Sequence, residues 1–557
     1  MYEQYQQAWA ALTAPGADFE IETIQIRGND CRIYRNAPLT LRDMWLISGA
    51  FAEQDYLVYQ DERLNYAQAH QQVANIATWL KQQGVESGDR VAIAMRNYPE
   101  WLLSYWAITS IGAAVVGMNA WWTGPEMTYA LEDSTPKVLI LDSERLDRLE
   151  PDATQNLHCV LVRAENENCT PWETLVSGSH NLPDTAIDPD SDACIFYTSG
   201  TTGRPKGAQL THRGCVSNVW SMMFAGALQR VIAIQKGLVS EDDVPPPSAA
   251  LVTTPLFHVT ANNCVAQGTT VTGGKLVHMY KWDAGEALRL IEAEKITAMS
   301  GVPTMAREVI AHPDFEKTDT SSLLTLGGGG AQLQPDLVHK IENSVETARP
   351  TTGYGMTETC GIITSISGDH FVDKAASCGP AMPCYEAKVV DADGHPVAQG
   401  ERGELCVRGA QVIRGYLNRP EATADTIVDG WLRTGDVAKI DEHGFIFIVD
   451  RLKDMVLRGG ENIYCAEVES ALFEHDAVTE CSVFGVPDDR LGEEVGAAIY
   501  TTSEVSTAAL REHCAPLLAA YKIPRYIWLL SEPLPRNASG KFLKRELRDK
   551  LDPNQAG

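Results

Sequence analysis

Residues 197–207 read YTSGTTGRPKG and directly follow the apolar run ACIF at residues 193–196, which has the character of a buried strand. The stretch combines hydroxyl side chains and glycines with one lysine, Lys206. Glycine lets the backbone fold closely around an oxyanion, hydroxyl groups add hydrogen-bond donors, and a lysine adds a point charge. The pattern therefore predicts a phosphate-binding loop at the end of a strand.

A Walker A loop is the usual alternative for such a stretch, but its template ends in Gly-Lys-Ser/Thr. Here Pro205, Lys206 and Gly207 occupy these positions, so the second glycine and the magnesium-binding hydroxyl are both missing. A P-loop nucleotide hydrolase is therefore disfavoured. A surface turn that is merely rich in Ser, Thr and Gly is the other alternative, and only the rest of the chain can exclude it.

Length, charge and cysteine content limit the classes of protein to which the chain can belong. The chain has 557 residues, and because single hydrophobic cores stop growing at about 250–300 residues, we expect more than one domain. The net charge of −28 argues against sequence-independent nucleic-acid binding, which needs an excess of Lys and Arg. The thirteen cysteines form no C-x-x-C pair and no Cys/His cluster, which indicates reduced thiols and a cytoplasmic protein.

One uncharged segment raises the question of a membrane span. Residues 101–125 carry no charge over about 25 positions, which is long enough to cross a bilayer. The segment contains several Ser, Thr, Gly and Asn residues and follows a strand-like run at 91–95, so we expect a buried helix and strand and no transmembrane segment. The amino terminus lacks the features of a signal peptide. Peripheral membrane contact and a homodimer stay open.

Helix-like and strand-like patterns alternate before the phosphate loop, which indicates parallel sheets covered by helices, an α/β fold. A proline-rich loop at 241–247 interrupts the middle of the chain. The elements expected are helices over 66–83, 211–228 (capped near Thr211) and 283–295, and strands over 90–95, 138–141, 159–162, 249–254 and 298–304.

Three further strings supply groups that suit a nucleotide. In TGYGMTE at 352–358, Tyr354 can stack on adenine, Thr357 can donate to a phosphate oxygen, and Glu358 can ligate Mg²⁺ through carboxylate oxygen. LRTGD ends in Asp436, whose carboxylate can accept hydrogen bonds from the ribose hydroxyls; a turn aspartate is the alternative. PRNASGK ends in Lys541, whose ammonium can neutralise developing charge in a site formed by another domain.

A glycine run, LGGGGAQ at 326–332, could mark a dinucleotide turn. It does not supply the spaced G-x-G-x-x-G pattern, because Gln332 occupies the last position. The string DRLKD at 450–454 ends a strand-like run, and MVLRGGENIY continues from it over 455–464. A charge run of this sort is usually a solvated face.

Together and in this order, these strings resemble the motifs of the adenylate-forming superfamily, which includes acyl-CoA synthetases, beetle luciferases and the adenylation domains of peptide synthetases. The resemblance covers nearly the whole chain. It implies an α/β architecture in which a large N-terminal domain of packed α/β subdomains, residues 1–450, binds ATP and the acyl group. A small mobile α+β C-terminal domain, residues 451–557, would carry the catalytic lysine.

The resemblance also implies roles for single residues. Lys541, Glu358, Lys206 and His258 would be catalytic, with His258 as a gate beside the acyl pocket, and Glu358 with Thr198 would hold the metal. Arg451 would contact the ribose, and Lys453 would be the pivot of the C-terminal domain. The full set expected to bind ATP or coenzyme A is Thr198, Ser199, Gly200, Thr201, Thr202, Gly203, Lys206, Gly329, Gly330, Ala331, Gln332, Gly353, Tyr354, Gly355, Met356, Thr357, Asp436, Arg451, Lys453, Arg458, Gly459, Gly460 and Lys541.

The implied reaction uses ATP, Mg²⁺ and coenzyme A. A carboxylic acid becomes an acyl-AMP with release of pyrophosphate, and coenzyme A then displaces AMP. The string FHVTANN at 257–263 looks like fatty acyl-CoA ligases more than aromatic ones, so we expect a medium- or long-chain fatty acid. An aryl-CoA ligase and a luciferase-like enzyme are the alternatives. An α/β hydrolase is not supported, because G-x-S-x-G is absent.

Overall fold

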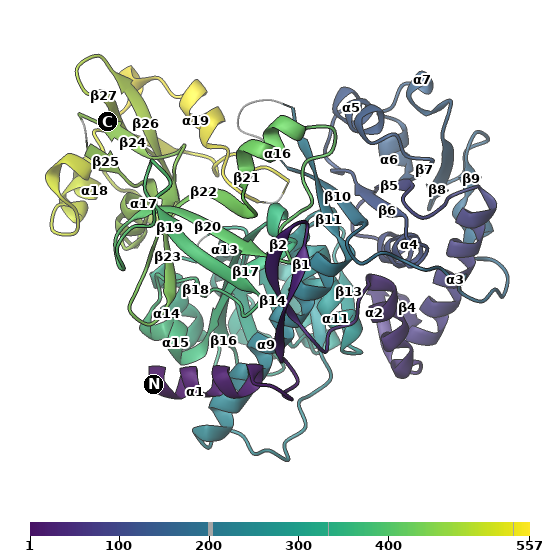
Figure 1. Cartoon of the computed structure of the whole chain (residues 1–557). Coiled ribbons are helices and arrows are strands. Elements are labelled where there is room, and N and C mark those ends of the chain that lie inside the picture. Colours follow the sequence, from purple (N-terminus) through teal and green to yellow (C-terminus); the bar gives the residue numbers. More distant parts are fainter. Residues whose placement is uncertain (199–203, 332, 460, 539) are drawn as a thin grey trace.

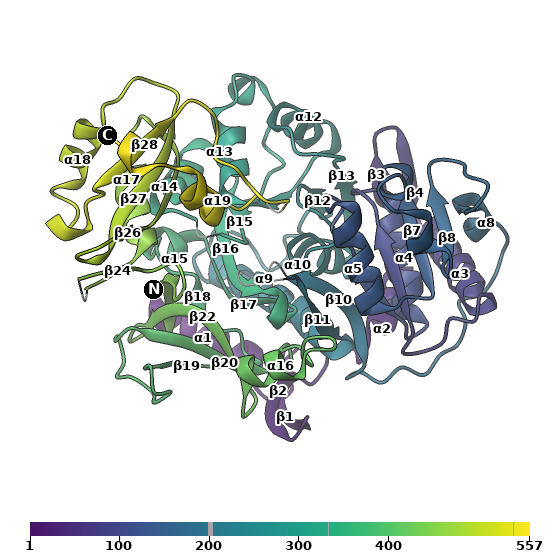
Figure 2. The same ribbon diagram turned by 90° about the horizontal axis from the view of Figure 1, so that it is seen from above.

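The computed structural model describes residues 1–198, 204–331, 333–459, 461–538 and 540–557, which form an α/β fold built on several sheets (Figure 1). The sheet that contains β5 to β11 lies at one end of the molecule and the C-terminal sheet lies at the other (Figures 1 and 2). The predicted site residues that lie outside the described residues are Ser199, Gly200, Thr201, Thr202, Gly203, Gln332 and Gly460.

A seven-stranded sheet has the order β11-β10-β6-β5-β7-β8-β9 and is parallel except for the antiparallel pair β10 and β11. Its strands are β5 (Arg90–Ala94), β6 (Ala114–Gly117), β7 (Val138–Asp142), β8 (His158–Val162), β9 (Thr170–Pro171), β10 (Asp192–Thr198) and β11 (Lys206–Thr211). The helices before and between β5, β6 and β7 are α3 (Tyr66–Gln82), α4 (Pro99–Ser110) and α5 (Gly124–Ser134).

An eight-stranded sheet has the order β17-β16-β15-β14-β12-β13-β3-β4, and only its two outer pairs are antiparallel. Its strands are β3 (Asp55–Tyr59), β4 (Glu62–Asn65), β12 (Ala249–Val252), β13 (Lys275–His278), β14 (Ala298–Gly301), β15 (Thr325–Gly328), β16 (Arg349–Met356) and β17 (Gly361–Ser367). Four longer helices in this part of the chain are α9 (His212–Gln235), α12 (Ala284–Glu294), α13 (Pro303–Ala311) and α14 (Pro335–Ser344).

The last two large sheets follow in sequence. The first contains β18 (Gly379–Pro380), β19 (Tyr385–Val390), β20 (Gly403–Gly409), β21 (Ile427–Val428), β22 (Trp431–Ile440) and β23 (Phe445–Arg451). The second contains β24 (Val456–Arg458), β25 (Glu461–Ile463), β26 (Val478–Asp488), β27 (Gly492–Thr501) and β28 (Tyr526–Leu530), with α17 (Cys465–Phe473), α18 (Thr507–Cys514) and α19 (Lys544–Lys550). The C-terminal sheet buries its own core, which includes Val456, Val468, Val483 and Ile499. We keep the division of the chain at residues 450 and 451 as a proposal.

The predicted elements form as the sequence indicates, but three differ in length. The helix expected over 211–228 continues to Gln235 in α9, the strand expected over 249–254 ends at Val252 in β12, and the strand expected over 298–304 ends early. Thr211 caps α9 by accepting a hydrogen bond from the Gly214 amide at 3.0 Å, and Asp283 caps α12 in the same way. The run at 298–304 was expected to be a strand throughout, but the strand ends at Gly301 and a helix begins at Pro303. Proline favours the first helical position because its φ is already helical and its missing N–H costs nothing there.

The uncharged segment 101–125 forms the buried helix and strand that the sequence predicts as far as Gly117, and several of the residues after it are at least partly exposed. Every residue of α4 and β6 is buried. No helix among the described residues is both long enough and apolar enough to cross a membrane.

Candidate active site

The two described ends of the phosphate-loop motif lie on the antiparallel strands β10 and β11. Thr198 and Lys206 are paired across the hairpin, and the Thr198 hydroxyl donates to the Lys206 carbonyl at 3.4 Å. The Lys206 ammonium lies 4.1 Å from the centre of the Tyr416 ring, which is a cation–π contact. Lys206 therefore contacts an aromatic residue more than 200 positions further along the chain.

Glu358 lies in a short turn directly after β16 and is buried, with 7% of its surface exposed. The Tyr416 hydroxyl donates to its Oε1 at 2.7 Å, and the amide of Ile413 donates to its carbonyl at 3.0 Å. Among the described residues, Oε2 of Glu358 accepts no hydrogen bond. A carboxylate oxygen and a threonine hydroxyl such as that of Thr198 are hard oxygen donors of the kind that Mg²⁺ prefers.

Tyr416 is a functional candidate that the sequence reasoning missed. Its hydroxyl donates to Glu358 and its ring contacts the Lys206 ammonium, so one side chain contacts two predicted site residues. Nothing in the string RGYLN at 414–418 indicates this role, because Tyr416 reaches both partners only through the tertiary fold.

A second cluster gathers around Asp436. This residue lies within strand β22, opposite Arg451 on β23, and Nε of Arg451 is 3.5 Å from its Oδ1. The hydroxyl of Tyr354 donates to its Oδ2. Burial raises the pKa of Asp436 above its ordinary value, and the Tyr354 hydrogen bond and the Arg451 charge act against this rise. The predicted ribose and adenine residues are thus adjacent.

Lys541 reaches these clusters from the C-terminal end of the chain. The Lys541 amide donates to Oδ1 of Asn537 at 3.0 Å, and the Asn537 amide donates to the Lys541 carbonyl at 2.9 Å, so a closed turn presents the lysine. Its Cε lies 3.6 Å from where a Cβ on Gly330 would stand. Burial and the Arg451 charge lower the pKa of Lys541 to about 8, although Asp436 and Glu358 attract its ammonium.

His258 lies at the turn that follows β12, beside the ring of Phe257, with the two ring centres 4.6 Å apart. Burial, followed by repulsion from the Lys541 ammonium, lowers the pKa of His258 to about 4. The imidazole is therefore neutral near neutral pH. The Lys541 ammonium is close enough to act on the imidazole electrostatically.

Gly353 and Gly355 lie where the backbone of the neighbouring strand leaves little room for a Cβ. A Cβ on Gly355 would stand 1.9 Å from the Gly361 carbonyl of the neighbouring strand, and one on Gly353 would stand 3.1 Å from the Thr364 carbonyl. Gly330 has φ +77°, a left-handed conformation that favours glycine. Gly329 and Ala331 flank Gly330, while Met356 and Thr357 connect β16 to Glu358.

Arg458 and Gly459, which belong to the set expected to bind ATP or coenzyme A, do not join this cluster. Arg458 binds Glu494 of β27 with Nε to Oε2 at 2.7 Å, and the Gly459 amide donates to the Leu491 carbonyl at 2.7 Å. Lys453 is exposed in the turn between β23 and β24. The contacts of Arg458 and Gly459 thus stay within the C-terminal part of the described chain.

Two family descriptions match the chain, "AMP-binding enzyme" over residues 49–417 and "AMP-binding enzyme C-terminal domain" over residues 467–541. A feruloyl-CoA synthase of an Amycolatopsis species is 37% identical over 489 residues, covering 87% of this chain and 93% of that protein. A long-chain-fatty-acid–CoA ligase of Mycobacterium tuberculosis is 32% identical over 500 residues, covering 88% and 93%. The solved o-succinylbenzoate coenzyme A synthetase of Bacillus subtilis with ATP and magnesium ion has a TM-score of 0.75 at 28% identity, covering 91% of this chain and 99% of that one.

Proposed function

The chain belongs to the AMP-binding enzymes, the adenylate-forming superfamily, and on this premise we propose that it converts a carboxylic acid to its coenzyme A thioester through an acyl-AMP. It is an AMP-forming acid–thiol ligase that uses ATP, Mg²⁺ and coenzyme A. The observation that carries the proposal is that Cε of Lys541 lies 3.6 Å from where a Cβ on Gly330 would stand, while Glu358 and Asp436 attract its ammonium. Four motifs that are far apart in sequence meet there.

The reaction has two displacements. A carboxylate oxygen attacks the α-phosphorus of ATP, the new O–P bond forms, and pyrophosphate leaves with the electrons of the broken P–O bond. The sulfur of coenzyme A then attacks the acyl carbon after losing its proton to solvent, and AMP leaves. Because the first step brings one anion onto another, the protein contributes mainly positioning and charge neutralisation.

The roles follow from the placement of each group. Lys206 and Thr198 would hold the departing phosphates, and Asp436 with Arg451 would hold the ribose. Mg²⁺, held by Glu358 and Thr198, would neutralise charge on the phosphates. Lys541 would meet the charge that develops at the α-phosphate.

The second half-reaction needs Lys541 to leave. We assign the pivot to Lys453, which is exposed in the turn between the two sheets. Rotation there would bring the Arg458–Gly459 tip to the site, where glycine leaves room for a thin thiol chain. His258, neutral and beside Lys541, would then border the thiol path.

Two classes of carboxylic acid are candidates for the substrate. A medium- or long-chain fatty acid is the class that the string at 257–263 predicts, and one similar relative is a fatty-acid ligase. An aromatic acid with a polar ring substituent is favoured by buried amides on the helical segments that follow His258. Asn262 and Gln267 are fully buried, and Oδ1 of the first and Oε1 of the second have no hydrogen-bond partner among the described residues. A substrate hydroxyl would satisfy such an acceptor, whereas an alkyl chain would not.

A panel of acids, assayed for AMP release with and without coenzyme A, tests the proposal. The panel should contain octanoate, palmitate, benzoate, 4-hydroxybenzoate and ferulate. AMP that depends on the acid supports the proposal, and the preferred acid decides between the two classes. Absence of acid-dependent AMP with every member would contradict it.

The pKa of Lys541 predicts a pH dependence. Its ammonium is charged below about pH 8 and neutral above it, so kcat/KM for ATP should fall about tenfold per pH unit above this value. The measurement is acid-dependent ATP–pyrophosphate exchange between about pH 6.5 and pH 9.5. The Lys541→Arg variant is the control, because its residual activity should lack the alkaline fall. A flat wild-type profile would exclude the role of the ammonium.

The contact of Tyr416 with Glu358 predicts a selective effect on magnesium. Tyr416→Phe removes the hydroxyl but keeps the ring beneath Lys206, so the Mg²⁺ concentration for half-maximal exchange should rise about 3- to 10-fold. Tyr56→Phe, which removes a buried tyrosine hydroxyl bonded to Thr270 and Trp106 instead of a site residue, is the matched control. An unchanged Mg²⁺ requirement in Tyr416→Phe would reduce Tyr416 to a packing residue.

We place the protein in the cytoplasm, since all thirteen cysteines are free thiols. A homodimer remains a prediction from the sequence.

A further inference from the structure

Arg96 carries a charge that the catalytic cluster does not use. It follows β5, and its guanidinium carbon lies 4.1 Å from the centre of the Trp121 ring and 4.9 Å from that of Tyr280. Its Nε and Nη1 are buried and have no hydrogen-bond partner among the described residues. A guanidinium that lies between two aromatic rings and donates no hydrogen bond from these two nitrogens is available to bind an anion.

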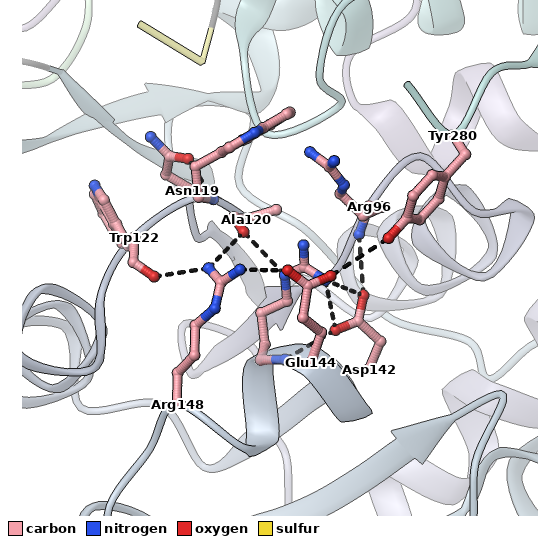
Figure 3. Close-up of polar contacts among 10 residues, drawn as sticks. Arg96, Asn119, Ala120, Trp122, Asp142, Glu144, Arg148 and Tyr280 are labelled. Carbon is pink, nitrogen blue, oxygen red and sulfur yellow. Dashed lines mark hydrogen bonds and ion pairs between the residues drawn. The ribbon is translucent and has the colours of Figure 1, made fainter. Parts of the chain in front are cut away.

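The carboxylates around Arg96 are already neutralised by other arginines. Both oxygens of Asp142 accept from Arg145 at 3.0 Å, and Glu144 binds Arg145 and Arg148. Asp142 meets Arg96 only through the Arg96 backbone amide, at 3.3 Å. Figure 3 shows the Arg96 guanidinium pointing away from Asp142 and Glu144.

The same arginines fix the segment that presents Trp121. Arg148 donates to the carbonyls of Ala120 and Trp122, each at 2.9 Å (Figure 3). Arg145 donates to the Ala120 carbonyl at 2.9 Å. Trp121 between them is 45% exposed. A rigidly held indole with a free surface offers a face on which a planar base can stack.

A continuous series of contacts joins Arg96 to the catalytic cluster. The Trp121 ring lies 5.7 Å from the Phe257 ring, which in turn lies 4.6 Å from His258 beside Lys541. Asn97, next to Arg96 in sequence, accepts from the Leu256 amide at 3.0 Å and donates to the Thr254 carbonyl at 3.0 Å. The Arg96 site is therefore tied to the turn that presents His258.

We propose that Arg96, Trp121 and Tyr280 bind the phosphate-bearing nucleotide of coenzyme A, with Arg96 on a phosphate group and Trp121 against the base. The inference rests on the proposed function, in which the thiol must reach the acyl carbon near Lys541 and His258. The phosphates of ATP are assigned to Lys206 and Thr198, so a second phosphate-bearing substrate needs a cation of its own. In a chain of net charge −28, an arginine without a paired carboxylate is a suitable anchor.

The test compares coenzyme A with pantetheine, a thiol that lacks the nucleotide. Arg96→Ala should raise KM for coenzyme A about 10- to 100-fold, the loss expected for a hydrogen bond to a charged group, and leave KM for pantetheine at the wild-type value. Arg96→Gln, which keeps most of the side-chain volume, should do the same if the alanine variant folds poorly. Arg289→Ala, which removes an exposed arginine paired with Glu286, is the matched control.

Other outcomes separate the possible failures. Equal changes in KM for both thiols, or none for either, would overturn the inference and leave the proposed function standing. A rise in KM for the acid in ATP–pyrophosphate exchange, without a rise for coenzyme A, would assign Arg96 to an anionic acid substrate and also overturn it. If the wild-type enzyme forms no thioester from coenzyme A, the proposed function itself fails.

Discussion

Replacing Lys541 with alanine is expected to lower acid-dependent ATP–pyrophosphate exchange at least about 100- to 1,000-fold, the typical cost of removing one donor that stabilises developing negative charge. The reason lies in the position of the side chain. Cε of Lys541 lies 3.6 Å from where a Cβ on Gly330 would stand, and Asp436 and Glu358 attract the ammonium, so its charge lies among the predicted nucleotide residues. Lys206 is not assigned the role of Lys541, because its ammonium lies against the Tyr416 ring.

The same variant should form thioester from supplied acyl-AMP and coenzyme A, because the second displacement takes place after Lys541 has left. Lys550→Ala is the matched control, since it removes an exposed lysine that pairs with Glu546 in the last helix. An equal loss in both half-reactions would show that Lys541 supports the fold rather than adenylation.

Glu358→Gln is expected to raise the Mg²⁺ concentration for half-maximal exchange at least about 100-fold. Mutation of a residue that only hydrogen-bonds to a metal ligand typically lowers metal affinity 10- to 100-fold. Mutation of a metal ligand itself should lower the affinity by at least the upper end of this range. The amide keeps the shape of the side chain and its bond from Tyr416, so the change removes mainly charge.

The exchange rate measured against Mg²⁺ concentration tests this prediction. Glu346→Gln, which neutralises an exposed carboxylate, is the matched control. A Glu358→Gln variant with a wild-type Mg²⁺ requirement would remove Glu358 from the metal site and leave Thr198 without its partner.

Local sequence patterns predicted the elements of the fold well. Apolar runs such as 90–95 and 138–141 became parallel strands because each run is too short for a helix and is buried on both faces. The caps at Thr211 and Asp283 could be predicted because capping depends on neighbours three residues away. The strand expected over 298–304 was wrong at its end, where Pro303 starts a helix.

The site was only partly predictable. Motif strings indicated Glu358, Asp436 and Lys541, but their approach to one another depends on how three sheets meet. Arg96 and Tyr416 carry no local signal, because an arginine after a strand and a tyrosine after glycine are common in any chain. Their importance comes from partners that are distant in sequence, which one sequence without a structure does not reveal.

Isotope transfer tests the central claim most directly. The preferred acid, labelled with ¹⁸O in both carboxylate oxygens, is incubated with the enzyme, ATP, Mg²⁺ and coenzyme A. If a carboxylate oxygen attacks the α-phosphorus, the AMP must carry one ¹⁸O atom while the pyrophosphate stays unlabelled. Unlabelled AMP, or label in inorganic phosphate formed with ADP, would contradict the acyl-AMP route.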